Sequence, residues 1–207
     1  MKKKPVKERI LDAALRLFNE KGFHGVSVEQ IVEEANTSKG GFYHNFKSKD
    51  ELLYQIHDVF ITHAIEETKE AYNHYKTPIT RLCAILDSFT KIFALYQSHI
   101  TVFYQESMYL SESFQKAINL KRDQYRHLLE QVIREGQERG DFRKEIPANI
   151  VTLAIIGMIN WTYKWFDQNG PLSMEAIADI FKDFVLHALI TEAGKQEAGK
   201  VAKSFSR

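Results

Sequence analysis

Apolar residues recur at three- and four-residue intervals along most of this 207-residue chain, and no stretch shows the sustained alternation typical of a β-strand. The first such segment places Ile10, Ala14 and Leu17 on one helical face, and Gly22 follows where a helix would end. The predicted helices span about residues 6–21, 28–35, 38–46, 49–75, 78–96, 98–109, 112–139, 147–168 and 173–193. The chain is therefore predicted to be all-α, with about nine helices.

The composition is that of a globular protein with a substantial core, since 44% of the residues are hydrophobic and 12% aromatic. Cys83 is the only cysteine, which excludes an intramolecular disulfide and a cysteine-based zinc site and fits a reducing cytoplasm. No apolar run approaches the ~18 residues of a membrane span, and no apolar segment follows the basic N-terminus. We therefore expect a cytoplasmic protein with no membrane partner.

Residues 27–46 contain two short helical segments separated by a polar break. Ser27 begins a capping box that ends at Gln30, and Asn36 and Thr37 interrupt the apolar pattern a few residues later. A second box, at residues 48–51, starts a longer helix. Two short helices behind a first one are typical of a helix-turn-helix, whose second helix enters the major groove of DNA. Residues 1–50 are therefore predicted to form a three-helix DNA-binding domain, with residues 51–194 as a helical body and 195–207 as a polar tail.

Two adjacent glycines, Gly40 and Gly41, lie inside the second of these short helices. Each costs about 1 kcal/mol relative to alanine, so a purely structural helix has reason to avoid them. Without Cβ atoms, however, the backbone can approach a sugar-phosphate chain or base edges closely. The first 50 residues also hold ten Lys and Arg against seven Asp and Glu. These features favour a DNA-contacting helix over a solvated polar helix with a glycine kink.

The string TSKGGFYHNFKSKDEL at residues 37–52, with ILDAA at residues 10–14, closely resembles the TetR family of bacterial regulators, over about residues 6–66. The resemblance implies a homodimer, usually a repressor, that binds a palindromic operator in double-stranded DNA and holds a small ligand in its C-terminal domain. Lys39 and Gly40 would contact bases. Many relatives have Thr or Ala in place of Gly41. The expected DNA-binding residues are Ser27, Thr37, Ser38, Lys39, Gly40, Gly41, Tyr43, His44 and Lys49, with phosphates held by Ser27, Thr37, Tyr43, His44 and Lys49.

The body is rich in aromatic residues, which usually form core or dimer interface but here are dense enough to line an apolar pocket. Residues 160–166 and 170–173 are similar to TetR-type regulators that sense acyl-CoA thioesters, which implies a small hydrophobic effector of that class. Arg122 and Arg126 could hold a CoA phosphate or be ordinary solvated charges. The expected ligand-binding residues are Phe103, Tyr104, Met108, Arg122, Tyr125, Arg126, Trp161 and Trp165.

The last two long helices are expected to pair with their copies in the homodimer, because a monomer would expose a costly apolar surface. The residues expected there are Ile155, Ile156, Ile159, Ile180, Phe184 and Leu189. Effector binding is expected to change the separation of the two DNA-binding domains, which must match major grooves about 34 to 36 Å apart.

Two other function classes compete with a ligand-responsive regulator. A helical metal-carboxylate enzyme would need Glu-x-x-His motifs, and no histidine here has a glutamate three residues before it. The i, i+4 pairs, such as Glu70 with His74, lack further ligands nearby. We therefore expect no catalysis, no metal and no cofactor. An architectural DNA-binding protein without an effector remains the closer alternative, since it would need no pocket.

Overall fold

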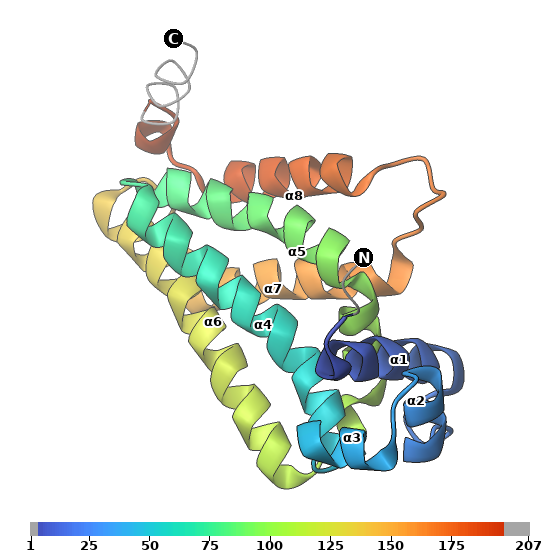
Figure 1. The fold of residues 1–207 in the computed structure, drawn as a ribbon. Helices are drawn as coiled ribbons and strands as arrows, with labels where there is room; N and C mark the ends of the chain where they lie inside the picture. Colours follow the sequence, from blue (N-terminus) through green and yellow to red (C-terminus); the bar gives the residue numbers. More distant parts are fainter. Residues whose placement is uncertain (1–3, 197–207) are drawn as a thin grey trace. The chain divides into compact units, whose positions relative to one another are not determined.

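The computed structural model describes residues 4–196, and eight α-helices and one 3-10 helix lie between residues 6 and 189 (Figure 1). None of residues 4–196 belongs to a strand, although one isolated antiparallel bridge joins Phe142 to Ile190. The elements are α1 (Val6–Lys21), α2 (Val28–Glu34), α3 (Lys39–Asn45), α4 (Lys49–His74), α5 (Pro78–Glu106), η1 (Ser107–Tyr109), α6 (Glu112–Arg139), α7 (Ala148–Trp165) and α8 (Met174–Leu189). The prediction of an all-α chain with about nine helices is confirmed.

The chain divides into two compact units that are discontinuous in sequence. Of the described residues, the first contains 4–61 and 96–121, and the second contains 62–95 and 122–196, so that α4, α5 and α6 each contribute to both. Two helices were predicted at about residues 78–96 and 98–109, and the break between them coincides with a kink of α5 at Tyr96, whose backbone is non-helical (φ −125°, ψ 17°). The functional division at residue 50 stays a prediction, and residues 197–207 of the predicted tail lie outside the described residues.

Most helix ends follow the local signals in the sequence. Gly22 ends α1 with φ 71°, and Gly140 follows α6 with φ 80°, a region that glycine occupies without strain. The second capping box is only half formed, because Ser48 Oγ accepts from the Glu51 amide while the Glu51 carboxylate accepts from the amide of Lys47.

The last two long helices are shorter than predicted. α7 begins one residue after its predicted start and ends at Trp165, because Phe166 is extended. α8 ends at Leu189, because Ile190 is extended and forms the bridge to Phe142. Of the helices in residues 4–196, none combines the length and the apolar character that a membrane span needs.

The core of the first unit includes the apolar faces of the three N-terminal helices (Figure 1). Ile10 and Phe18 of α1, Ile31 of α2, and Phe42 and Phe46 in and after α3 are at most 1% exposed. Each of these short helices therefore depends on burial against the others.

The core of the second unit is formed by apolar residues from α5, α6, α7 and α8, such as Leu82 and Val132. Figure 1 shows α8 running alongside the first part of α5, where Lys182 Nζ lies 2.6 Å from Asp87 Oδ1. Ile155 and Leu189 also belong to this core, with 2% and 3% exposure. Their expected place on a dimer-forming surface is therefore wrong, because the folded monomer already buries them.

Candidate nucleic-acid interface

The segment from α2 to α3 has the geometry of a helix-turn-helix. The predicted capping box is formed, since the Gln30 amide donates to Ser27 Oγ (3.3 Å) and the Ser27 amide donates to Gln30 Oε1 (2.8 Å). In the turn, Asn36 has φ 47°, and the Thr37 amide donates to the Val32 carbonyl (2.9 Å). A non-glycine residue with positive φ costs strain, which Asn tolerates better than most.

α3 has one buried face and one exposed face. Ser38 caps its start by accepting from the Gly41 amide (3.0 Å), as the sequence predicts for a helix beginning there. Phe42 and Phe46 are buried, whereas the Tyr43 side chain is 55% exposed and His44 is exposed as well. The exposed face is therefore the one that carries the expected DNA contacts.

The two glycines of α3 have different surroundings. A Cβ at Gly41 would lie 2.5 Å from Thr37 Oγ1, so the close contact with the turn already accounts for a glycine there. A Cβ at Gly40 would meet only Ser38 Oγ, at 3.7 Å, which is ordinary contact. Among the described residues no close contact requires glycine at position 40, and close approach of an external molecule as its use stays a prediction.

Lys39 begins α3 and forms an exposed ion pair with Glu29 of α2, with Nζ 2.5 Å from Oε1. The hydrogen bond from Lys39 is the largest of several effects that lower the pKa of Glu29 to about 2. The same bond raises the pKa of Lys39. Lys39 would have to leave Glu29 at least in part to reach a base.

Lys49, at the start of α4, points into the domain. Its Nζ donates to the carbonyl oxygens of Phe23 (2.8 Å) and Val26, and it lies 4.5 Å from the centroid of the Phe23 ring. Burial lowers the pKa of Lys49. A lysine expected to hold a DNA phosphate is thus engaged with the loop between α1 and α2.

Sequence reasoning did not single out Arg9 of α1. Its Nη1 donates to the carbonyls of Ala35 and Asn36, both at 2.7 Å, where α2 ends and the turn begins. These partners lie 26 and 27 residues away along the chain. Only the positive charge of Arg9 among the apolar residues of α1 could have drawn attention to it.

The eight expected ligand-binding residues do not gather within one unit. Phe103, Tyr104 and Met108 belong to the first unit, and the other five belong to the second. Phe103 is 2% exposed, with its ring centroid 4.0 Å from that of His57, so it is a core residue of the first unit. Met108 is 73% exposed.

On α6 and α7 the remaining residues are largely at the surface. Trp161 and Trp165 are 60% and 48% exposed, and Arg122 is exposed. Arg126 is partly buried and pairs with Asp123 at 3.0 Å. Whether these residues hold an effector stays a prediction.

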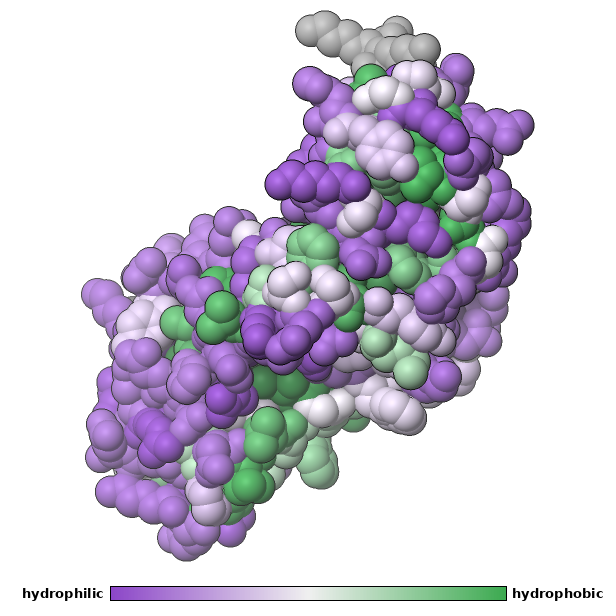
Figure 2. Space-filling model, turned by 90° about the horizontal axis from the view of Figure 1, so that it is seen from below, coloured by the Kyte–Doolittle hydropathy of each residue, from purple (hydrophilic) through white to green (hydrophobic). Residues whose placement is uncertain are grey.

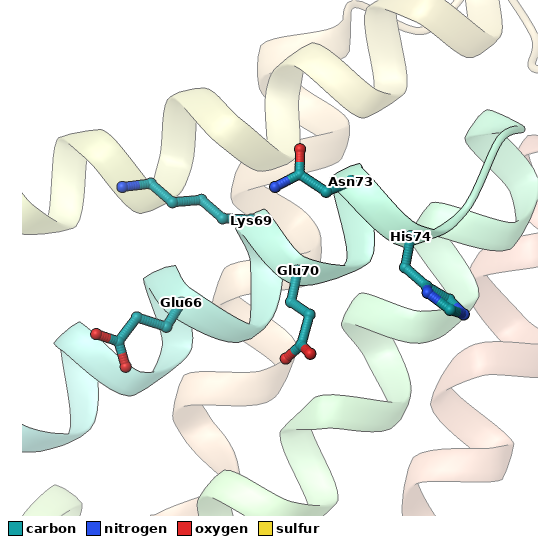
Figure 3. Close-up of a pocket in the computed structure, with 5 residues that line it drawn as sticks. All are labelled: Glu66, Lys69, Glu70, Asn73 and His74. Atoms are coloured by element: carbon teal, nitrogen blue, oxygen red, sulfur yellow. The ribbon is translucent and has the colours of Figure 1, made fainter.

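Two pockets of the second unit are lined by polar residues of α4 and α5. One, of about 480 Å³, is lined only by residues of α4, and Figure 3 shows Glu70 and His74 pointing to the same side of that helix. The other, of about 440 Å³, includes Glu67, Asp87 and Lys91. Neither pocket is lined by any of the expected ligand residues. Both are lined mainly by charged and polar residue types, unlike the aromatic lining expected for a hydrophobic effector.

A helix-turn-helix joined to a helical body defines the class of DNA-binding transcriptional regulators. Residues 10–56 match the family described as bacterial regulatory proteins, tetR family, and residues 75–189 match the tetracyclin repressor-like C-terminal domain. The chain belongs to the tetR family, and the resemblance found in the sequence is confirmed.

Individual relatives are distant in sequence but span nearly the whole chain. The HTH-type transcriptional repressor KstR2 of Mycolicibacterium smegmatis is 20% identical over 193 residues, covering 93% of this chain and 94% of the relative. The structure of the regulator PfmR from Thermus thermophilus is 28% identical, with a TM-score of 0.80 over 86% of this chain and 97% of PfmR. AibR in complex with isovaleryl coenzyme A and operator DNA is 23% identical, with a TM-score of 0.76 over 87% and 97%.

Proposed function

We propose that this protein is a homodimeric cytoplasmic repressor that binds a palindromic DNA operator through α2, the turn and α3, and leaves it when a small hydrophobic effector binds. The observation that carries the DNA-binding part is Gly40, an exposed helix residue whose missing side chain has no use within the fold. Its exposed neighbours Lys39, Tyr43 and His44 supply a cation, a phenol and an imidazole suited to bases and phosphates. KstR2, which is similar over most of the chain, is named as a repressor.

Within this proposal some of the residues contact DNA phosphates and others contact bases. Ser27, Thr37, Tyr43 and His44 bind phosphates and set the position of the domain on the duplex. Lys39 and the backbone at Gly40 reach base edges in the major groove. Ser38 and Gly41 lie at the same end of α3 and keep it properly capped for that approach.

The homodimer is supported by an apolar surface on the last two helices. The exposed residues on α7 are separated by three and by eight residues, and two on α8 lie four residues apart. Gly157, between them on α7, has nothing within 4 Å of its Cβ position. Large hydrophobic side chains left exposed on two helices suit helix pairing with a second copy. The residues are Ile150, Leu153, Trp161, Ile180 and Phe184.

For the effector we propose an acyl-CoA thioester. AibR, which has the same fold, was solved with isovaleryl coenzyme A and operator DNA. In this chain the acyl group would lie among Phe103, Tyr104, Met108, Tyr125, Trp161 and Trp165, with Arg122 or Arg126 on a CoA phosphate. Because Phe103 is buried and Met108 is exposed, such a pocket would need side chains to rearrange on binding.

The experiment has two stages. A duplex is first selected from a random pool by the wild-type protein, and its affinity is then measured with and without a panel of acyl-CoA thioesters, with free CoA as the control. We expect a palindrome whose half-sites are about one helical turn apart, and a weaker complex with at least one thioester. If no duplex is selected, the proposed function is wrong. If every thioester leaves both the affinity for the selected duplex and the thermal midpoint of the protein unchanged, the architectural alternative is favoured.

A further inference from the structure

α2 is a short helix that cannot hold its own position. With seven residues it is well below the ~12 residues at which an isolated helix becomes marginally stable. Its last turn contains no basic residue and instead carries Glu33 and Glu34, whose negative charges are repelled by the negative end of the helix dipole. Its orientation must therefore be set by neighbours, and that orientation governs how the turn and α3 meet DNA.

Arg9 supplies one such contact at the end of α2. Its guanidinium reaches from α1 to two consecutive carbonyls, those of Ala35 and Asn36. These oxygens lie where a helix leaves its last carbonyls unpaired, and a cation there also offsets the dipole. Asn36 is the one non-glycine residue in the described part of the chain with positive φ, so Arg9 binds the strained residue of the turn.

Lys49 supplies the corresponding contact before α2 begins. Its ammonium reaches from α4 to the carbonyls of Phe23 and Val26, and Val26 directly precedes Ser27, the N-cap of α2. The Phe23 ring, at 4.5 Å, adds a cation–π contact. Two of the three N–H donors of Lys49 are thus used inside the domain, which leaves at most one for a phosphate.

We propose that Arg9 and Lys49 are positioning residues for DNA recognition, which brace α2 at its two ends and act on DNA through the orientation of α2 and the turn. This inference rests on the proposed function and deepens it. It assigns Lys49 a different role from the phosphate contact that the family resemblance implies.

The test compares Arg9→Met and Lys49→Met with two charge-matched controls. Arg16 lies on the same helix as Arg9 but forms only an exposed ion pair with Glu34, and Lys47 is an exposed lysine two residues before Lys49. Affinity is measured against the duplex that the wild-type protein selects and against an unrelated duplex, over a range of KCl concentrations at a temperature where every variant is folded.

We expect Arg9→Met and Lys49→Met to lower the ratio of selected-duplex to unrelated-duplex affinity about tenfold or more, with the slope of log K against log salt unchanged. Arg16→Met and Lys47→Met should leave the ratio near the wild-type value. A slope smaller by about 0.9 for Lys49→Met would instead indicate one lost phosphate contact and overturn its assignment. An unchanged ratio would also overturn the proposal, because a merely structural residue would not alter discrimination.

Amide hydrogen exchange of the DNA-free protein tests whether Arg9 and Lys49 stabilise the ends of α2 independently of DNA binding. Arg9→Met should speed exchange at Asn36 and Thr37, and Lys49→Met at Ser27 and Gln30, whose amides form the bonds around the ends of α2. Unchanged exchange would refute the brace even if DNA binding is intact, whereas failure of the wild type to select any duplex would refute the proposed function. If a Met variant does not fold, the ratio is measured in Arg9→Gln and Lys49→Gln, whose shorter, uncharged side chains cannot reach both carbonyls, and a wild-type affinity ratio in them would overturn the proposal.

Discussion

Cations of the N-terminal region differ in what surrounds them, although the sequence presents them alike. Lys39 is exposed and forms an ion pair with Glu29, whereas Arg9 and Lys49 donate hydrogen bonds to backbone carbonyls. An exposed ion pair contributes little stability and exchanges readily with a new partner, so Lys39 remains available to DNA. A cation that satisfies two carbonyls cannot leave without uncovering them. Charge type alone therefore does not tell which cations of a DNA-binding domain contact DNA.

The ion pair between Lys39 and Glu29 predicts a pH-dependent contact. The pKa of Glu29 is about 2, below its ordinary value of 4.5, because Lys39 stabilises the carboxylate. The pair is therefore fully formed above about pH 4.5 and is lost as the pH falls through about 2. Carboxyl NMR titration should show the low pKa in the wild type and a higher pKa in Lys39→Met, which stays below 4.5 because the hydrogen bonds from the backbone and from Ser27 remain. Lys47→Met should leave Glu29 unchanged, and a wild-type midpoint already near 4.5 would contradict the pairing.

Gly40→Ala should separate stability from DNA binding. The Cβ position is open, so alanine should raise the free energy of unfolding by up to about 1 kcal/mol. The same methyl group would meet the DNA, so affinity for the selected duplex should fall at least tenfold. Denaturant unfolding and duplex titration measure the two effects.

Gly41→Ala is the matched comparison, because its Cβ would lie 2.5 Å from Thr37 Oγ1 and displace that hydroxyl. It should show little or none of the stabilisation. Gly40→Ala with unchanged DNA affinity would show that the glycine does not serve close approach.

At the scale of the elements, the ends of the helices are decided locally and their lengths are not. Ser27, Ser38 and Ser173 each cap a helix as the sequence predicts, because a cap needs only a side chain and an amide two or three residues away. α8 ends four residues early, since the chain turns extended to form the bridge with Phe142. No local pattern predicts that pairing.

Ser173→Ala should destabilise the second unit measurably. The Ala176 amide, which donates to Ser173 Oγ at 3.3 Å, would lose its partner at the start of α8. The expected loss is about 1 kcal/mol, seen as a lower thermal midpoint at a fixed protein concentration. Ser173→Asp keeps an acceptor and should remain close to the wild type. Equal midpoints for all three proteins would mean that the cap contributes nothing.

At the scale of the whole molecule, the exposed apolar surface of α7 and α8 is the feature that a single chain leaves unexplained. Figure 2 shows the molecule from below, away from α8, and on that face too hydrophobic side chains interrupt a mostly hydrophilic surface. Phe184 and Trp161 are 67% and 60% exposed, so each of the two helices presents a large hydrophobic side chain to solvent. A second copy of the chain would cover them.

Phe184→Glu should convert the proposed dimer to monomers. A carboxylate placed in a helix-pairing interface would be desolvated without a partner, which costs several kcal/mol. Sedimentation equilibrium should show the mass halved, and the emission of Trp161 and Trp165, the two tryptophans of the chain, should shift to longer wavelength. Leu120→Glu replaces another exposed hydrophobic residue, a leucine of the first unit, and should leave the dimer intact. A wild-type protein that sediments as a monomer would contradict the dimer.

The sequence by itself determined the all-α class, the bounds of most described helices within a few residues, the capped helix-turn-helix and the family. These depend on apolar periodicity and on side chains a few residues from the backbone groups they satisfy. Only the tertiary structure decided that Lys49 and Arg9 face inward, that Gly41 packs on Thr37 while Gly40 does not, and that Ile155 and Leu189 are core. For the inward cations and the buried residues, the reason is that contacts between segments far apart in the chain select among side-chain directions that are locally equivalent.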